Sequence, residues 1–149
     1  MRLIPPYPDP ETRSQAELKL FHELDKINLP DMICLHSLNL PEHQYKVMGE
    51  LDFVIVGPGG LLVLEVKGGG VTCKEGVWIQ VDRWGRSHRM KESPFKQASS
   101  GMWSLSRRMV DAGLSRELSD LTLGFGVIFP DVPFILKGEE WNLETVMDS

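Results

Sequence analysis

The chain has little cysteine and no long apolar run, and both shortages narrow the classes of protein to which it can belong. Only two of its 149 residues are cysteines, Cys34 and Cys73, and their separation does not match the paired spacing of a metal-binding motif. We expect both to be buried thiols rather than ligands or a disulfide. No stretch approaches the ~20 apolar residues of a transmembrane helix, and the start of the chain lacks the apolar segment of a secretory signal. We therefore expect a cytoplasmic protein without membrane contact.

The chain also lacks the strong positive charge of a protein that binds nucleic acid over its whole surface. Its formal net charge is −5, which argues against avid, non-specific binding of nucleic acid. Residues 83–96 nevertheless contain five cations and one anion, a net charge of +4 that leaves −9 on the rest. The cations are Arg83, Arg86, Arg89, Lys91 and Lys96. Such a basic segment is compatible with phosphate contacts at one place, and equally with a solvated loop.

The length and composition are those of one globular domain. A chain of 149 residues can enclose a single core, and 42% hydrophobic and 25% charged residues are ordinary values. We expect one domain over residues 1–149, with a core from about 11 to 130 and an acidic tail over 131–149. The chain is expected to be either this single domain or a piece of a longer protein.

A β-hairpin is the most clearly predicted element, and it contains misplaced charges. Residues 49–56 and 61–67 are two apolar, β-branched runs on either side of a Gly-Pro-Gly-Gly turn. Asp52, Glu65 and Lys67 lie inside these runs. Charges are costly to bury unless they are paired or bind a metal, so this misfit is the main functional signal in the sequence.

The hairpin register decides how these charges meet. If the turn is centred between residues 58 and 59, Asp52 faces Glu65 across the two strands. Side chains alternate between the faces of a strand, so Glu50, Asp52, Glu65 and Lys67 would share one side. Directly opposed side chains have Cβ atoms about 5 Å apart, and two carboxylates at that separation repel unless a proton or cation lies between them.

Carboxylate oxygens are hard ligands that suit Mg²⁺ or Mn²⁺, so the hairpin predicts a site for a divalent cation. Two alternatives stay open. A three-residue loop would move Asp52 opposite Val66 and remove the carboxylate pair. In a cross-strand ion cluster on an exposed face, Lys67 would instead neutralise Glu65 or Glu50.

A first helix is predicted from about Glu11 or Ser14 to Ile27. Ser14 and Glu17 have the spacing of a capping box, and Glu17 also projects onto the apolar stripe of the helix. Its carboxylate is therefore either a capping group or a group directed toward the core.

The second half of the chain supplies more strands and a second helix. We predict strands over 32–38, 71–73, 77–81 and 121–129, and a helix with Ser93 as N-cap that runs to about Ala112. Gln97 lies beside the apolar stripe of that helix. This order of helix, antiparallel strands, helix and strand predicts a compact α/β sandwich.

Asp52 followed by Glu65-Val66-Lys67 resembles the core of the PD-(D/E)xK, or restriction-endonuclease-like, nucleases. The pattern is most similar to the nuclease-related domain, abbreviated NERD. That family has an acidic residue on the first helix, a Gly-Glu-x-Asp strand, a Glu-Val-Lys strand and a glutamine on the next helix. The matching residues here are Glu17, Gly49-Glu50-Leu51-Asp52, Glu65-Val66-Lys67 and Gln97.

The resemblance implies a central, mixed, mostly antiparallel sheet flanked by helices and a metal-dependent nuclease that cleaves phosphodiester bonds in DNA, in DNA processing or repair. Asp52, Glu65 and the backbone carbonyl of Val66 would hold Mg²⁺ or Mn²⁺, with Glu17 as a further candidate ligand. Lys67 would act on the attacking water or the phosphate, and Gln97 would support the site.

The resemblance also concerns partners. Domains of this family are often joined to helicase or other modules, so DNA and a DNA-processing domain are the expected partners. The alternative function is a catalytically inactive module that binds DNA or a protein. Neither the sequence pattern nor the resemblance defines an oligomeric state.

Overall fold

The computed structural model describes residues 1–149 except 9, 11, 13, 41–48, 83 and 135–140. Its elements in chain order are β1 (Arg2–Ile4), α1 (Gln15–Asp25), β2 (Ile33–Asn39), β3 (Glu50–Gly57), β4 (Gly60–Val66), β5 (Gly70–Lys74), β6 (Val77–Val81), β7 (Ser87–Arg89), α2 (Pro94–Asp111), α3 (Ser115–Ser119), β8 (Leu123–Phe129), η1 (Leu143–Thr145) and β9 (Val146–Asp148). Within this described part, no helix is both long enough and apolar enough to span a membrane.

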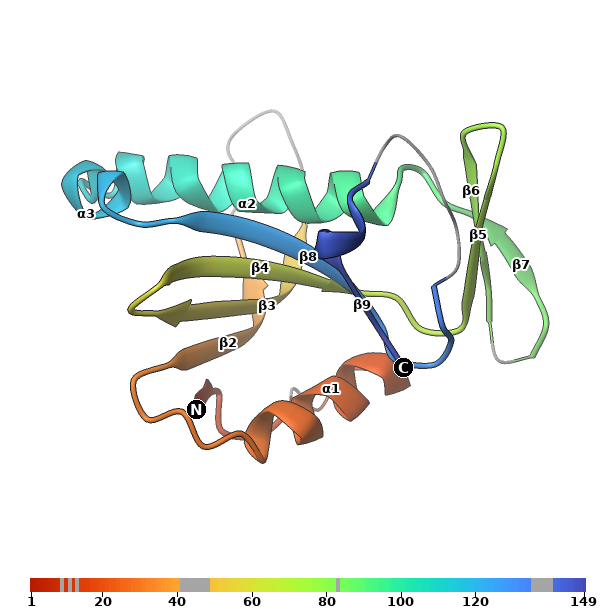
Figure 1. The fold of residues 1–149 in the computed structure, drawn as a ribbon, viewed down its shortest axis with the longest axis horizontal. Coiled ribbons are helices and arrows are strands. Elements are labelled where there is room, and N and C mark those ends of the chain that lie inside the picture. Colours follow the sequence, from red (N-terminus) through yellow and green to blue (C-terminus); the bar gives the residue numbers. More distant parts are fainter. Residues whose placement is uncertain (9, 11, 13, 41–48, 83, 135–140) are drawn as a thin grey trace.

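A mixed sheet of six strands forms the centre of the molecule, in the order β1-β2-β3-β4-β8-β9. Strands β2, β3 and β4 are antiparallel neighbours, whereas β1, β8 and β9 each join in parallel. Helix α1 packs on one face and α2 on the other (Figure 1). This is the α/β architecture that the order of elements predicts, and the mixed sheet flanked by helices is as the resemblance implies.

The hairpin register is as predicted. Gly57 pairs with Gly60 and the antiparallel ladder continues to Phe53, which pairs with Leu64. Pro58 and Gly59 are therefore the two loop residues, and the three-residue loop is excluded. The predicted alternation of side chains between the two faces of the sheet is interrupted on β3 at Asp52, as described below.

Both predicted helix starts are confirmed by their caps. The Ser14 hydroxyl accepts a hydrogen bond from the Glu17 amide, and the Ser93 hydroxyl accepts one from the Lys96 amide. Helix α2 packs against the sheet at Gly101, where a Cβ atom would be 2.5 Å from Leu51 Cδ2. Small residues at such positions let a helix approach a sheet closely.

The predicted antiparallel strands divide into two sheets. Strands β5, β6 and β7 form a separate antiparallel sheet beside the central one (Figure 1); we call this sheet, residues 70–89, the wing. The division occurs at the Gly68-Gly69-Gly70 run. A Cβ on Gly68 would lie 2.9 Å from that of Ala16, and Gly69 has φ +73° and a position where a Cβ would lie 2.2 Å from Val81 O. These glycines therefore permit close packing and are not simply a flexible loop.

The tail takes part in the fold, which its composition did not indicate. Strand β9 pairs in parallel with β8, and the Asp148 carboxylate accepts a hydrogen bond of 2.7 Å from the Phe134 amide. Trp141 stacks on Phe95, with ring centroids 5.4 Å apart, and meets Trp78 edge-on at 5.1 Å. The described residues beyond 130, which include Phe134, Trp141 and strand β9, thus complete one edge of the sheet and one part of the core.

Candidate active site

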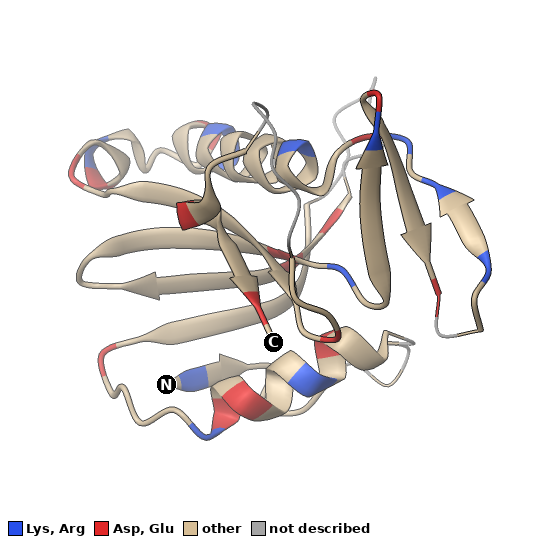
Figure 2. Ribbon diagram, turned by 45° about the vertical axis from the view of Figure 1, so that its right-hand side comes forward, with Lys and Arg blue, Asp and Glu red and all other residues tan. Residues whose placement is uncertain are grey.

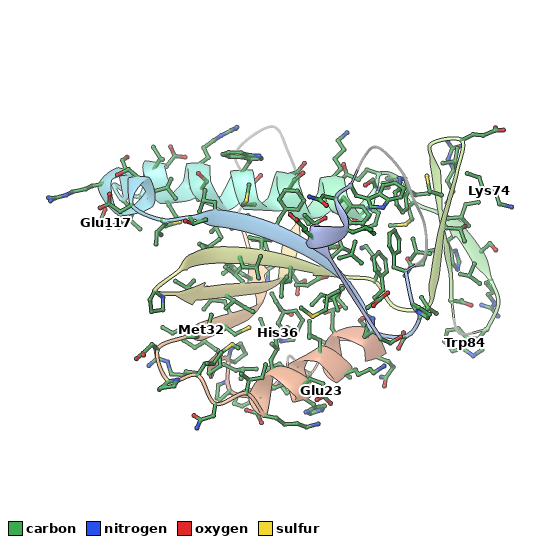
Figure 3. The ribbon with its side chains drawn as sticks, viewed as in Figure 1. Glu23, Met32, His36, Lys74, Trp84 and Glu117 are labelled. Carbon is green, nitrogen blue, oxygen red and sulfur yellow. The ribbon has the colours of Figure 1, made fainter. Side chains whose placement is uncertain are left out.

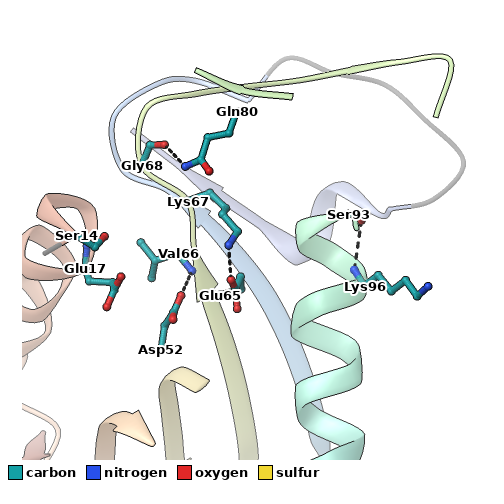
Figure 4. Close-up of polar contacts among 10 residues, drawn as sticks. All are labelled: Ser14, Glu17, Asp52, Glu65, Val66, Lys67, Gly68, Gln80, Ser93 and Lys96. Carbon is teal, nitrogen blue, oxygen red and sulfur yellow. Dashed lines mark hydrogen bonds and ion pairs between the residues drawn. The ribbon is translucent and has the colours of Figure 1, made fainter. Parts of the chain in front are cut away.

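Asp52 lies where the β3–β4 ladder ends. The last pair is Phe53 with Leu64, and beyond it the Val66 amide donates to Asp52 Oδ2 at 2.7 Å (Figure 4). Leu51 belongs to the cluster on the α2 face although Phe53 belongs to the α1 face. Residues two apart on a regular strand share a face, so β3 departs from regular alternation at Asp52. The Asp52 carboxylate thus accepts the hydrogen bond from the Val66 amide that a backbone carbonyl of β3 would accept in a regular ladder.

Glu65 and Lys67 form an ion pair at the end of β4. Glu65 Oε1 lies 2.5 Å from Lys67 Nζ, and only 13% and 16% of the two side chains are exposed. The Lys67 amide is held by Ile128 O at 2.9 Å, so the strand end is anchored to β8. The predicted pairing of Lys67 with Glu65 is present, but in a largely buried position rather than on an exposed face.

The electrostatics of the site show excess negative charge. Burial, and then the neighbouring Glu65, raise the pKa of Asp52 to about 8, against the opposing effect of the Val66 amide. Burial also raises the pKa of Glu65, although Lys67 opposes that shift. One lysine therefore does not compensate the two carboxylates, and the site favours a proton or a cation.

The Glu17 side chain is largely buried, and the helix cap involves the Glu17 backbone amide rather than its carboxylate. Its amide is bound by the Ser14 cap, while its side chain is only 18% exposed. Burial raises its pKa, and its negative charge acts on both Asp52 and Glu65. In Figure 4 its carboxylate points from α1 toward Asp52. It is therefore a third acidic group at this site.

Gln97 lies in the second turn of α2, four residues before Gly101, and so on the same side of the helix. Gly101 packs against Leu51 and Val63 of the sheet. The Gln97 Oε1 atom is buried and has no hydrogen-bond partner among the described residues. A buried acceptor without a partner is costly, which is a reason to expect a ligand or water there. No direct contact joins Gln97 to the carboxylates among the residues that the structure describes.

The basic residues predicted to bind nucleic acid are divided between two places. Arg89, Lys91 and Lys96 line a pocket of about 450 Å³ that also includes Trp78 and Glu92. The charge of Glu92 acts on Glu65, so one lining residue of this pocket is within electrostatic reach of that carboxylate. Arg86 is exposed near the β6–β7 turn of the wing, away from that pocket, and Arg83 lies outside the described residues.

The donor set fits a hard divalent cation that keeps much of its water. Among the residues described, no three His, Cys, Asp or Glu side chains converge tightly enough to form a metal site by themselves. Mg²⁺ typically binds one or two carboxylates and retains several waters. Two largely buried, incompletely neutralised carboxylates, Asp52 of β3 and Glu65 of β4, meet that requirement, and the Val66 carbonyl remains a proposed third ligand.

The sequence did not indicate that His36 lies next to Glu17 of the candidate site. The His36 side chain is fully buried and lies between the sheet and α1 (Figure 3). It stacks on Phe53 with ring centroids 4.7 Å apart, and its Nε2 lies 3.9 Å from Glu17 Oε2. Cys34, two residues earlier, is buried in the same cluster. The period-two burial of this strand was the only signal available, and it predicts a core position rather than a neighbour of Glu17.

Comparison with known proteins gives one match. The family model described as nuclease-related domain matches residues 12–130, which include all four sequence segments that carry the resemblance. Searches of curated proteins and of solved structures give no significant match.

Proposed function

Because this chain belongs to the nuclease-related domain family, a class of nuclease-like module with a restriction-endonuclease-like α/β fold, we propose that it hydrolyses phosphodiester bonds in DNA with Mg²⁺ or Mn²⁺. The observation that carries this proposal is the largely buried pair Asp52 and Glu65 beside Lys67 at the end of the hairpin. Burying like charges destabilises a fold, so such an arrangement is typical of a functional site.

Asp52, Glu65 and the Val66 carbonyl would hold the cation, with Glu17 within electrostatic reach. When bound, Mg²⁺ or Mn²⁺ supplies a Lewis acid and lowers the pKa of coordinated water. The Val66 amide orients Asp52 by its hydrogen bond of 2.7 Å. Helix α1 brings Glu17 to the end of β4 from one side, and Glu65 lies on the other side (Figure 4).

Lys67 is proposed to act in catalysis more than in binding of the cation. Its ammonium group provides no metal ligand, and it lies 2.5 Å from Glu65 Oε1. A fixed positive charge at that position can orient the attacking water or stabilise negative charge on the phosphate as it develops. Such charge matters most in the transition state.

DNA would approach from the side of the basic pocket. Arg89, Lys91 and Lys96 line that pocket, and Ser93 caps α2 there, so cations and a helix N-terminus are available for phosphates. Figure 2 shows basic segments along the wing and at the start of α2. Contacts to phosphate would make the affinity fall as the salt concentration rises.

The test is cleavage of labelled single-stranded and duplex DNA with Mg²⁺ or Mn²⁺, combined with calorimetric titration of Mn²⁺. Asp52→Asn should lose both Mn²⁺ binding and cleavage. Lys67→Ala should retain Mn²⁺ binding and lose cleavage by about 10²-fold or more. Lys26→Ala removes an exposed lysine at the C-cap of α1, and it should retain both. Equal Mn²⁺ binding by Asp52→Asn and the parent would refute the metal assignment.

The same ion pair favours a second candidate function. Lys67 already neutralises part of the carboxylate charge, so the domain could be a module that binds DNA without cleaving it. In that case DNA would be retarded in a gel while no product appears on any strand form with Mg²⁺ or Mn²⁺. The cleavage assay separates the two functions.

A further inference from the structure

A histidine is buried next to Glu17, in a place that an apolar ring could fill. The His36 imidazole lies between two aromatic side chains: it stacks on Phe53 with ring centroids 4.7 Å apart and meets Phe21 edge-on at 5.3 Å. The cluster around these rings is apolar, and none of the His36 side chain is exposed. Burying a polar ring is costly unless its nitrogens meet polar groups, so the nitrogens of His36 need an explanation that packing alone does not give.

Glu17 and Ser37 both approach one of these nitrogens. His36 Nε2 lies 3.9 Å from Glu17 Oε2 and 3.3 Å from Ser37 Oγ. The first distance is longer than a hydrogen bond, so that interaction is electrostatic, whereas the second is within hydrogen-bonding reach. The two aromatic neighbours restrict rotation of the imidazole. His36 Nε2 therefore presents a polar group in a fixed position to the Glu17 carboxylate.

The backbone at Ser37 is distorted, and the distortion lies opposite Asp52. The β2–β3 ladder is regular as far as the pair of His36 and Phe53 and resumes after a gap, but the intervening pair, Ser37 and Asp52, is not formed. Ser37 has φ +53°, a left-handed conformation that is unfavourable for a residue with a Cβ. Such conformations persist where the surrounding structure requires them, often at functional sites. The strained serine is also the residue whose hydroxyl supports His36 Nε2.

We propose that His36 is a positioning residue that keeps the Glu17 carboxylate turned toward Asp52. The Ser14 hydroxyl also attracts this carboxylate, and in Figure 4 Ser14 and Asp52 lie on opposite sides of it. With the imidazole beside it, the carboxylate stays at the strand ends, where its charge acts on Asp52 and Glu65. Groups that orient a ligand carboxylate affect the affinity for a cation although they do not touch it.

This inference rests on the proposed function, and its first test is the affinity for Mn²⁺, measured by calorimetry in the absence of DNA. His36→Phe keeps the aromatic ring and removes the nitrogens, and it should weaken Mn²⁺ binding by about tenfold. His36→Gln should retain most of the affinity, because its amide can place an N–H group near the position of Nε2. The matched control is His22→Phe: His22 also meets Phe21 edge-on but is exposed on α1, so the affinity should not change.

A double-mutant cycle distinguishes positioning of Glu17 from a general effect on packing. Glu17→Gln alone should weaken Mn²⁺ binding at least as much as His36→Phe does. Adding His36→Phe to Glu17→Gln should then weaken binding by less than about twofold, because the losses of coupled residues do not add. An equal, roughly tenfold loss in both backgrounds would overturn the inference, as would an unchanged affinity in His36→Phe.

Thermal unfolding shows whether each variant is folded. If His36→Phe is not, Ser37→Ala takes its place in the cycle, because it removes the supporting hydroxyl at a half-buried position. It should weaken Mn²⁺ binding in the parent and leave the affinity of Glu17→Gln unchanged. Unchanged binding in the parent background would then overturn the inference.

A crystal structure of the same variant without metal tests the position of Glu17 directly. The carboxylate should turn from Asp52 toward Ser14, whereas in His22→Phe it should stay in place. An unmoved carboxylate would overturn the inference. Absence of Mn²⁺ binding by the parent would refute the metal assignment of the proposed function, and the crystal structure would then decide the positioning role by itself.

Discussion

At the scale of single residues, Asp52 shows how a site can reduce the stability of the fold that holds it. Its carboxylate accepts the Val66 amide and so ends the β3–β4 ladder. Burial and the charge of Glu65 nevertheless raise its pKa to about 8. The ionised form is therefore unfavourable in the folded protein near neutral pH unless a cation is present.

Asp52→Asn should therefore stabilise the cation-free protein, and increasingly so as the pH rises. The folded-state pKa of Asp52 is raised from 3.8 to about 8, so folding takes up a proton. The stabilisation from this proton is fully present below about pH 4 and is lost as the pH rises toward 8. Asparagine cannot ionise but can still accept the Val66 amide.

Thermal unfolding in EDTA from pH 5 to 8 tests this prediction. We expect the melting temperature of Asp52→Asn to exceed that of the parent by about 4 °C or more at pH 8. Removing the buried charge should raise the free energy of unfolding by on the order of 2 kcal/mol. Asp31→Asn, at an exposed position, should follow the parent at every pH. Parallel curves for Asp52→Asn and the parent would contradict the raised pKa.

At the scale of elements, the junction between β4 and the wing depends on glycine. Gly69 combines φ +73° with a position where a Cβ would lie 2.2 Å from Val81 O. An alanine there must both adopt the left-handed region and displace backbone. Because this junction follows Lys67 directly, its geometry affects both the site and the orientation of the wing.

A series of three glycine variants separates these effects. At Gly59 an added Cβ would contact no atom within 4 Å, and the backbone φ is ordinary. At Gly76 it would also contact no atom, but φ is +75°. At Gly69 both the left-handed φ and the contact with Val81 O oppose an alanine. We expect Gly59→Ala to be neutral, Gly76→Ala to cost about 1 kcal/mol and Gly69→Ala about 3 kcal/mol or more. Chemical unfolding measures the order, and an equal cost at Gly76 and Gly69 would show that the contact with Val81 does not matter.

At the scale of the whole molecule, the site is assembled from segments distant in sequence. Helix α1 supplies Glu17 and the hairpin supplies Asp52 and Glu65, whereas Gln97 at the start of α2 has no direct contact with these carboxylates among the described residues. The tail closes the aromatic cluster beneath the basic pocket, where Trp141 contacts Trp78 and Phe95. The family match ends at residue 130, so this part of the core lies beyond the matched range.

Trp141→Ala should show that the tail belongs to the cooperative fold. Loss of its ring contacts with Trp78, Phe95 and Phe134 should cost about 2–4 kcal/mol, somewhat less than for a fully buried tryptophan. Trp103→Ala, on the exposed side of α2, should cost less than about 0.5 kcal/mol. Urea unfolding measures both, and an unchanged midpoint for Trp141→Ala would mean that the tail packs without contributing stability.

Local patterns were sufficient for α1, α2, the hairpin and its register, whereas the short helix α3 was not predicted. Capping residues act on the adjacent turn, and a two-residue loop defines pairing over the whole hairpin. The acidic and basic residues of the site were therefore identifiable in advance, because a charge inside an apolar strand is anomalous wherever the strand packs. Their catalytic and ligand roles remain predictions.

Tertiary structure alone decided how the antiparallel strands divide into two sheets, where the tail packs and what surrounds Glu17. The break at Gly69 depends on an approach to Val81 that no local pattern encodes, and β9 gains its partner only through β8. The irregularity at Asp52 arises because Leu51 and Phe53 enter different clusters. Contacts between segments distant in sequence determine these features, and residue order specifies such contacts only through the complete fold.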